Sequence, residues 1–149
     1  MVQPKVISVN ISDTRGVRKT PIPEGQLKEG IGLVNDGHSG TDREVSLLAL
    51  ESIEKMRQKG LDVNPGDFAE NLTTEGIDLM ALSIGTKLSV GENIILKITQ
   101  KGKECPEPCA IYYQAGECVM PKEGIFADVL TGGTITPGDS IEVIETQKE

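Results

Sequence analysis

Alternation of hydrophobic and polar residues is the main pattern along this chain. It runs through residues 6–11 and 93–100, and a period of two is typical of a strand with one buried face. Residues 85–90 and 138–143 share a second scheme, a glycine turn followed by an alternating strand, which is common in small barrels. In the first two strands, the residues predicted to lie on the buried faces are Ile7, Val9 and Ile11, and Ile94, Leu96 and Ile98.

One segment, from about residue 42 to 59, has helical periodicity instead. Thr41 and Glu44 match a capping box, in which the two side chains satisfy free amides of the first turn. Gly60 is suited to end the helix. One face carries the hydrophobic residues Val45, Leu48, Ala49, Ile53 and Met56. We therefore predict an α+β fold with a mainly antiparallel, β-barrel-like core, one substantial helix over 42–59 and short helical turns.

Length and charge narrow the class of protein. The chain has 149 residues with no linker and no tandem repeat, so we predict a single domain over 1–149. Aromatic residues make up 3%, and the core must therefore be aliphatic. The net charge of −8 argues against a long basic face for nucleic acid or an anionic membrane.

The compartment prediction rests on the N-terminus and on the cysteines. The N-terminal residues turn polar and charged before a signal-peptide core develops, and no apolar run approaches the ~20 residues of a membrane span. The three cysteines are an odd number, which favours reduced thiols over a disulfide scaffold. We expect a cytoplasmic protein that has neither a nucleic acid nor a membrane as partner.

The thiols are the most informative chemical feature. Cys105, Cys109 and Cys118 follow the predicted strand 93–100, and prolines 106 and 108 place Cys105 in a loop. Lys103 is two residues away, and a neighbouring cation lowers the pKa of a thiol. Three interpretations remain open: a reactive or metal-ligating thiol, incidental buried thiols, and a structural zinc site completed by His38. The spacing C-x3-C-x8-C is not a usual zinc spacing.

Basic and polar residues supply the other candidates. His38 and Arg43 flank the start of the predicted helix, where the amides of a helix N-terminus attract anions. Arg18 and Lys19 belong to the densest basic cluster. Each has an alternative role as a solvated loop residue, and Arg43 also as a partner in a surface ion pair.

Several short blocks occur in a fixed order along the chain: residues 16–21, 36–40 with 43–48, 70–73 with 84–85, 98–105, 118–127, 132–133 and 138–139. Taken in order, these blocks resemble a known family, the MOSC domain, which occurs at the C-terminus of molybdenum-cofactor sulfurases and in stand-alone proteins. The resemblance extends over nearly the whole chain.

The resemblance implies a β-rich fold and a molybdenum–molybdopterin cofactor. It implies that one signature cysteine carries sulfur or ligates molybdenum, and Cys105, five residues after Gln100, is our match, with Cys109 as second choice. The residues matched to cofactor contacts are Arg18, Lys19, His38, Arg43, Asn71, Thr73 and Lys103.

Several functions are compatible with this resemblance. One is a sulfur-carrier or reductase component, acting in cofactor sulfuration or in reduction of N-hydroxylated compounds. The chain has no flavin or nicotinamide fingerprint and no pyridoxal-phosphate domain, so a separate electron-donor protein or a cysteine desulfurase would be its partner. The alternative is a cofactor- or metal-binding module without turnover, and a structural zinc domain is the third.

Overall fold

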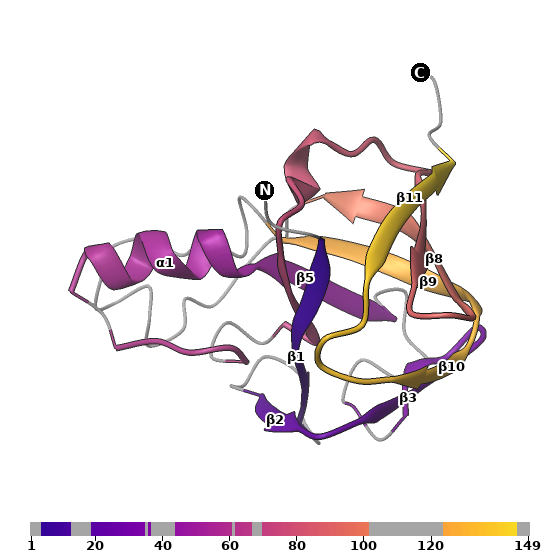
Figure 1. The fold of residues 1–149 in the computed structure, drawn as a ribbon, viewed down its shortest axis with the longest axis horizontal. Coiled ribbons are helices and arrows are strands. Elements are labelled where there is room, and N and C mark those ends of the chain that lie inside the picture. Colours follow the sequence, from indigo (N-terminus) through magenta and orange to yellow (C-terminus); the bar gives the residue numbers. More distant parts are fainter. Residues whose placement is uncertain are drawn as a thin grey trace.

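A computed structural model of the chain describes residues 4–12, 19–34, 36, 44–60, 62–66, 70–101 and 124–145 (Figure 1). In these ranges the protein has mostly strands and one α-helix, so the α+β class is confirmed. The helical elements are α1 (Leu50–Gln58) and a 3-10 turn, η1 (Leu79–Ala81). The strands are β1 (Lys5–Ile11), β2 (Thr20–Ile22), β3 (Gly25–Lys28), β4 (Gly32–Leu33), β5 (Val45–Ala49), β6 (Leu72–Glu75), β7 (Lys87–Val90), β8 (Ile94–Lys101), β9 (Ile125–Thr131), β10 (Gly133–Ile135) and β11 (Ile141–Glu145).

The strands form two sheets. The larger has eight strands in the order β11-β7-β8-β9-β5-β6-β1-β2, and the smaller has the order β10-β3-β4. All pairs are antiparallel except β5 with β6. A single bridge between Lys5 and Ser140 links β1 to the segment before β11. The larger sheet is not closed into a barrel, so the barrel-like part of the prediction is supported only loosely.

The core is aliphatic, as the composition requires. On β8, Ile94, Leu96 and Ile98 are buried while Lys97 is exposed, which confirms the alternation predicted there. Phe126 is the one aromatic residue in the described part of the core. Among the described residues, the structure has no helix that is both long and apolar enough to span a membrane.

Strand β1 departs from the predicted alternation. Val6 and Val9 are fully buried, whereas Ile7 and Ile11 are only half-buried. The pairing with β6 shifts register between Val6 and Ser8. Such a bulge places an extra residue in one strand and changes which side chains face inward. The prediction that Ile7 shares the core face with Val9 is therefore wrong, because a bulge cannot be read from a period of two.

The predicted helix over 42–59 is wrong in its first part. Residues 45–49 form β5, all five buried, between β9 and β6. A strand covered on both faces has a continuous apolar run, and a helix can have the same run. The helix begins only at Leu50, and its N-cap, Ala49, makes no side-chain cap bond.

The capping box is therefore also wrong, and the predicted anion site loses the helix N-terminus on which it was based. The Glu44 carboxylate accepts a hydrogen bond from the Val129 amide of β9, at 3.0 Å, instead of capping a helix. Strand β5 separates the helix from His38 and Arg43 in the chain, so these residues do not flank a helix N-terminus. Both lie outside the described residues.

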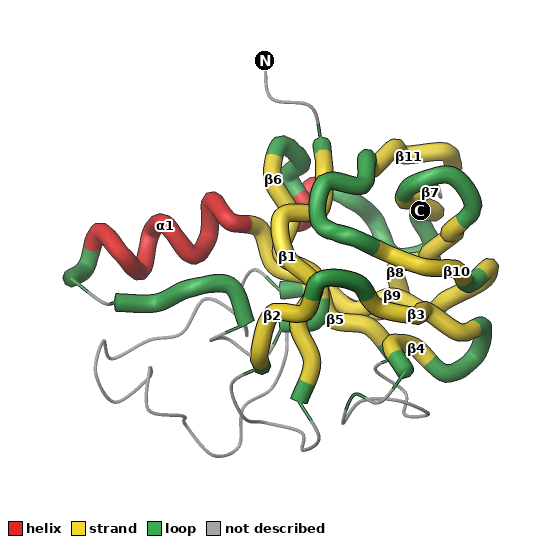
Figure 2. Tube along the Cα trace, turned by 60° about the horizontal axis from the view of Figure 1, so that its bottom comes forward, coloured by secondary structure: helices red, strands yellow, loops and turns green. Residues whose placement is uncertain are grey.

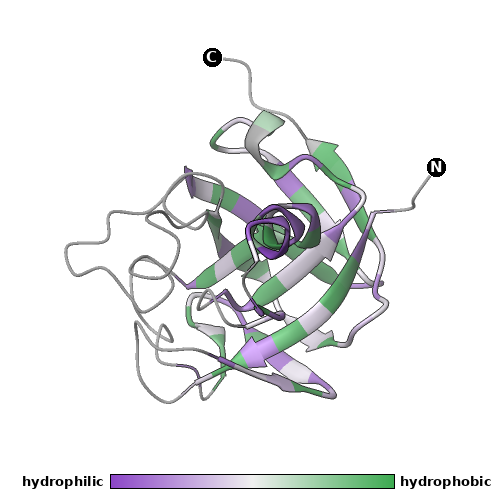
Figure 3. Ribbon diagram, turned by 90° about the vertical axis from the view of Figure 1, so that its left-hand side faces the viewer, coloured by the Kyte–Doolittle hydropathy of each residue, from purple (hydrophilic) through white to green (hydrophobic). Residues whose placement is uncertain are grey.

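Helix α1 extends away from the strands (Figures 1 and 2). Viewed end-on in Figure 3 it is largely hydrophilic, and its buried residues are Ser52, Ile53 and Met56. Arg57 fixes the segment that returns toward the sheet. Its guanidinium donates to the Val63 carbonyl at 2.8 Å and to Asn64 Oδ1 at 3.2 Å, and it pairs with Glu54.

Two glycines in the same loop region offer a matched test of the packing between β4 and β5. Gly32 has φ +107°, and a Cβ there would overlap the Glu44 carbonyl. Gly30 also has positive φ, 75°, but open space around it. We expect Gly30→Ala to lower the free energy of unfolding by about 1–2 kcal/mol. Gly32→Ala should cost roughly 3 kcal/mol or more, because steric overlap adds to backbone strain. Urea denaturation measures both, and equal losses would contradict this account.

Candidate functional site

One row of paired residues crosses five neighbouring strands of the larger sheet. Lys101 of β8 pairs with Ile125 of β9, which pairs with Leu47 of β5. Leu47 pairs with Leu72 of β6, and Leu72 with Val9 of β1. We call these five residues the anchor row. The five strands β8, β9, β5, β6 and β1 are consecutive in the larger sheet.

The segments predicted to carry the chemistry attach to the sheet close to this row. Segments 13–18, 37–43 and 102–123 each have an end within four residues of an anchor-row residue, and so does segment 67–69, in which no site residue was predicted. They lie outside the described residues, and so do the predicted site residues Cys105, Cys109, Cys118, Lys103, Arg18, His38 and Arg43. What the structure defines is the frame from which these segments depart.

Asn71 is the centre of that frame. Its side-chain oxygen accepts hydrogen bonds from the backbone N–H of Ser46, at 2.9 Å, and from the Ser46 hydroxyl, at 3.1 Å. Its amide nitrogen donates to the Asn10 carbonyl at 3.3 Å, and its own carbonyl accepts from the Asn10 N–H at 2.7 Å. Asn71 is fully buried and joins β1 to β5 one residue before β6 begins.

Thr73 belongs to the same buried polar network. Its hydroxyl donates to the Glu70 carboxylate at 2.7 Å and accepts from the Asn10 amide at 3.2 Å. Asn10 also accepts from the Ser8 hydroxyl at 2.7 Å. All four residues are buried. The structure therefore places Asn71 and Thr73 inside the protein, where their polar groups bond to neighbouring strands.

Lys19 is also internal. Its ammonium lies 2.7 Å from Asp36 Oδ1, and neither side chain has any exposed surface. The ammonium also donates to the Ser12 hydroxyl at 3.2 Å, and the Ser12 N–H donates to Asp36 at 3.1 Å. The Lys19 N–H donates to the Gly66 carbonyl at 2.7 Å. The charge of Lys19 is thus compensated within the protein.

A pair of carboxyl groups lies where β5 meets β9. Burial raises the pKa of Glu44 above its ordinary value of 4.5, and the nearby charge of Asp128 raises it further, while the hydrogen bond from Val129 opposes the shift. Within the described ranges, no group of three or more His, Cys, Asp or Glu residues could hold a metal ion. Thiol ligands in this chain come only from segment 102–123.

Sequence reasoning missed Asn10, Ser46 and Asp36. For Ser46 the available signal was its position, because it is the one polar residue in an apolar strand, whereas Asn10 lies in an alternating stretch where its burial could not be read. A buried polar side chain requires a hydrogen-bonding partner, so each such residue indicates a contact with a distant segment. The sequence does not name that partner.

The Asn71 network can be tested through stability. Asn71→Ala leaves the Ser46 N–H and the Asn10 carbonyl without their side-chain partner, and we expect a loss of about 2–4 kcal/mol in the free energy of unfolding. Asn93→Ala, at an exposed turn, is the matched control and should stay within about 0.5 kcal/mol. Urea denaturation measures both. A loss at Asn71 no larger than at Asn93 would show that the network is not stabilising.

The Glu44 carboxyl predicts a pH dependence. Its raised pKa means that the folded protein holds this proton more tightly than the unfolded chain does. The contribution to stability is therefore complete below about pH 4.5 and is lost as the pH rises through the raised folded-state pKa. Glu44→Gln retains an acceptor for Val129 and should remove this fall. Unfolding measured from pH 4 upward tests it, with the exposed Glu29→Gln as control. An unchanged pH profile in Glu44→Gln would reject this account.

Comparison with known structures identifies the fold. The YuaD protein from Bacillus subtilis superposes with a TM-score of 0.81 at 19% identity, covering 98% of each chain. YiiM from Geobacillus stearothermophilus gives 0.69 at 19% identity, over 95% of this chain and 75% of that one. YiiM from Escherichia coli gives 0.68 at 20% identity, over 100% and 73%. Among curated protein sequences, none matches significantly.

The sequence itself assigns the family. The family model of the MOSC domain matches residues 35–142, which include β5 to β10 and the whole cysteine segment. This range covers most of the chain and agrees with the resemblance noted from the individual sequence blocks. The chain belongs to the MOSC domain family.

Proposed function

We propose that this protein binds a molybdenum–molybdopterin cofactor and that Cys105 supplies the thiolate for it. The family is associated with this cofactor in general, which supports the proposal at the level of class. The observation that carries it for this chain is the anchor row. The segment with all three thiols and the segments with Arg18, His38 and Arg43 attach to neighbouring strands close to one row of the sheet.

The donor chemistry of the chain fits such a cofactor. Thiolates are soft ligands that suit a metal bound through sulfur, and the chain has three of them within 102–123. The cofactor phosphate is an anion, for which arginine is the preferred partner because its planar fork bonds two oxygens. We assign this role to Arg18 and Arg43, with His38 and Lys103 as further cationic or donor groups.

The described residues have a different part in the proposal. The polar groups of Asn71 and Thr73 bond to Asn10, Ser46 and Glu70, and the Lys19 ammonium pairs with Asp36. These contacts stabilise the frame of the site. When bound, the cofactor would supply a metal able to exchange oxygen or sulfur ligands and electrons. Lys103, two residues from Cys105, would favour the thiolate at Sγ.

Two roles follow for a protein of this kind. One is sulfur transfer or reduction of N-hydroxylated compounds, with a cysteine desulfurase or an electron-donor protein as partner. The other is cofactor binding without turnover. Measuring molybdenum, pterin and persulfide in protein from a cofactor-producing host distinguishes both roles from a structural zinc domain. Turnover of a hydroxylamine-type substrate with an electron donor then distinguishes the reductase from a protein that binds the cofactor without turnover.

The assignment of Cys105 gives a direct test. We expect Cys105→Ser to abolish molybdenum retention or persulfide loading, while the free energy of unfolding changes by no more than about 1 kcal/mol, since the substitution is nearly isosteric. Metal analysis and mass spectrometry of the purified protein measure the first effect, and urea denaturation the second.

Cys109→Ser and Cys118→Ser are the matched controls. Both should retain wild-type molybdenum and persulfide content. Equal loss in all three variants, with zinc in the wild type, would replace the proposal with a thiolate zinc site. Loss only in Cys109→Ser would move the assignment to that residue.

A further inference from the structure

The ion pair between Lys19 and Asp36 lies where two of the proposed site segments, 13–18 and 37–43, begin or end, next to the start of segment 67–69. Ser12 precedes segment 13–18 and Lys19 follows it. Asp36 precedes segment 37–43, and Gly66 precedes segment 67–69. These four residues are joined to one another by the hydrogen bonds of Lys19 and Ser12.

Lys19 and Asp36 are both charged, and charged side chains are rarely buried completely. The two charged side chains have no exposed surface, and burying two charges costs several kcal/mol that their attraction only partly offsets. Replacing a buried ion pair by two apolar side chains of similar volume is often neutral or stabilising. An ion pair differs from an apolar pair in that its hydrogen bonds fix the relative positions of the residues involved. Here Asp36 Oδ1 accepts from both the Lys19 ammonium and the Ser12 amide.

The backbone around the junction is equally constrained. Gly66 has φ +93°, and a Cβ there would overlap the Lys19 carbonyl. The close approach lets the Gly66 carbonyl accept from the Lys19 N–H at 2.7 Å. Segment 62–66 is held in turn by Arg57 of α1 through Val63 and Asn64.

We infer that Lys19 and Asp36 form an ionic clasp that fixes the bases of two site segments, 13–18 and 37–43, so that Lys19 positions the cofactor-binding residues instead of contacting the cofactor phosphate. This inference deepens the proposed function and rests on it for one of the two measurements below, the pterin content of the protein. The other readout, on protein without cofactor, does not depend on it.

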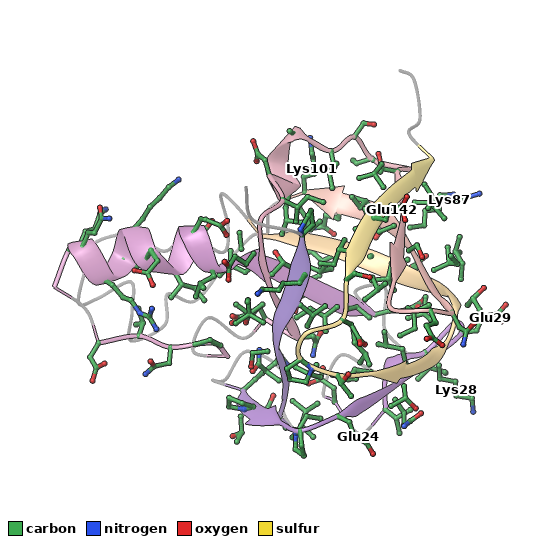
Figure 4. The ribbon with its side chains drawn as sticks, in the orientation of Figure 1. Glu24, Lys28, Glu29, Lys87, Lys101 and Glu142 are labelled. Atoms are coloured by element: carbon green, nitrogen blue, oxygen red, sulfur yellow. The ribbon has the colours of Figure 1, made fainter. Side chains whose placement is uncertain are left out.

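The decisive variant is the double substitution Lys19→Met with Asp36→Leu. It removes both buried charges together, so we expect the midpoint of thermal unfolding to stay near that of the wild type, whereas Lys19→Met alone should lower it. Lys28→Met, which removes an exposed lysine that points away from the protein in Figure 4, is the control. Lys19→Arg keeps the charge and provides a milder variant.

Two readouts are applied to each folded variant. The imidazole resonances of His38 report on segment 37–43 in cofactor-free protein, and they are unambiguous because the chain has one histidine. Pterin content after expression in a cofactor-producing host reports on binding. In the double variant we expect displaced His38 resonances and at least about a tenfold loss of pterin. Lys19→Arg and Lys28→Met should resemble the wild type in both.

Other outcomes overturn the inference. Unchanged His38 resonances with lost pterin, in the double variant or in Lys19→Arg, would make Lys19 a direct ligand. Wild-type values of both readouts in the double variant would leave the pair a purely structural role. If wild-type protein holds no pterin, the proposed function fails, while the His38 resonances still decide whether the clasp positions its segment.

Discussion

The structure depends on how the protein satisfies buried polar groups at the starts of two parallel strands. Strands β5 and β6 begin at the same end of the sheet, and β1 ends beside them. No ladder pairing joins β1 to β5, because β6 lies between them. Just before β6 begins, the Asn71 side chain bonds to both. An asparagine has both a donor and an acceptor, so one side chain completes both strands where the ladder is missing.

The same constraint shapes the segments that leave the sheet. A chain that leaves a buried strand must satisfy its backbone before it reaches solvent. Here Asn10, Glu70 and Thr73 do so on one side, and Ser12, Lys19 and Asp36 on the other. The two groups are adjacent in the chain, since Asn10 lies near the end of β1 and Ser12 directly follows that strand. The frame of the candidate site therefore combines the hydrophobic residues of the anchor row with buried polar contacts.

An acidic chain that binds an anionic cofactor needs positive charge close to the cofactor. Lys19, which directly follows segment 13–18, has its charge compensated by Asp36. In the proposed site, attraction for a phosphate would come from Arg18, His38, Arg43 and Lys103 instead. Screening over about 8–10 Å separates such a pocket from the acidic surface elsewhere. Affinity and positioning thus fall to different residues.

The sequence by itself determined the family, the strand-rich class and the aliphatic core. It did so because the period of two on β8, the near absence of aromatic residues and the ordered sequence blocks are local properties of the chain. Thr73, Asn71 and Lys19 could be singled out by the same blocks, but only as polar residues without partners.

Tertiary structure decided three features that the sequence did not: the strand at 45–49, the buried face of β1 and the inward position of Lys19. Each of these features depends on a contact between distant segments. Residues 45–49 became a strand because β6 and β9 pair with its two edges and its five side chains are all buried, although their apolar run also suits a helix. Val6 replaced Ile7 in the core because β1 bulges against β6. Lys19 turned inward because Asp36, 17 positions away in the chain, neutralises it. Local sequence records which groups need partners, and only the packed chain determines which partners they find.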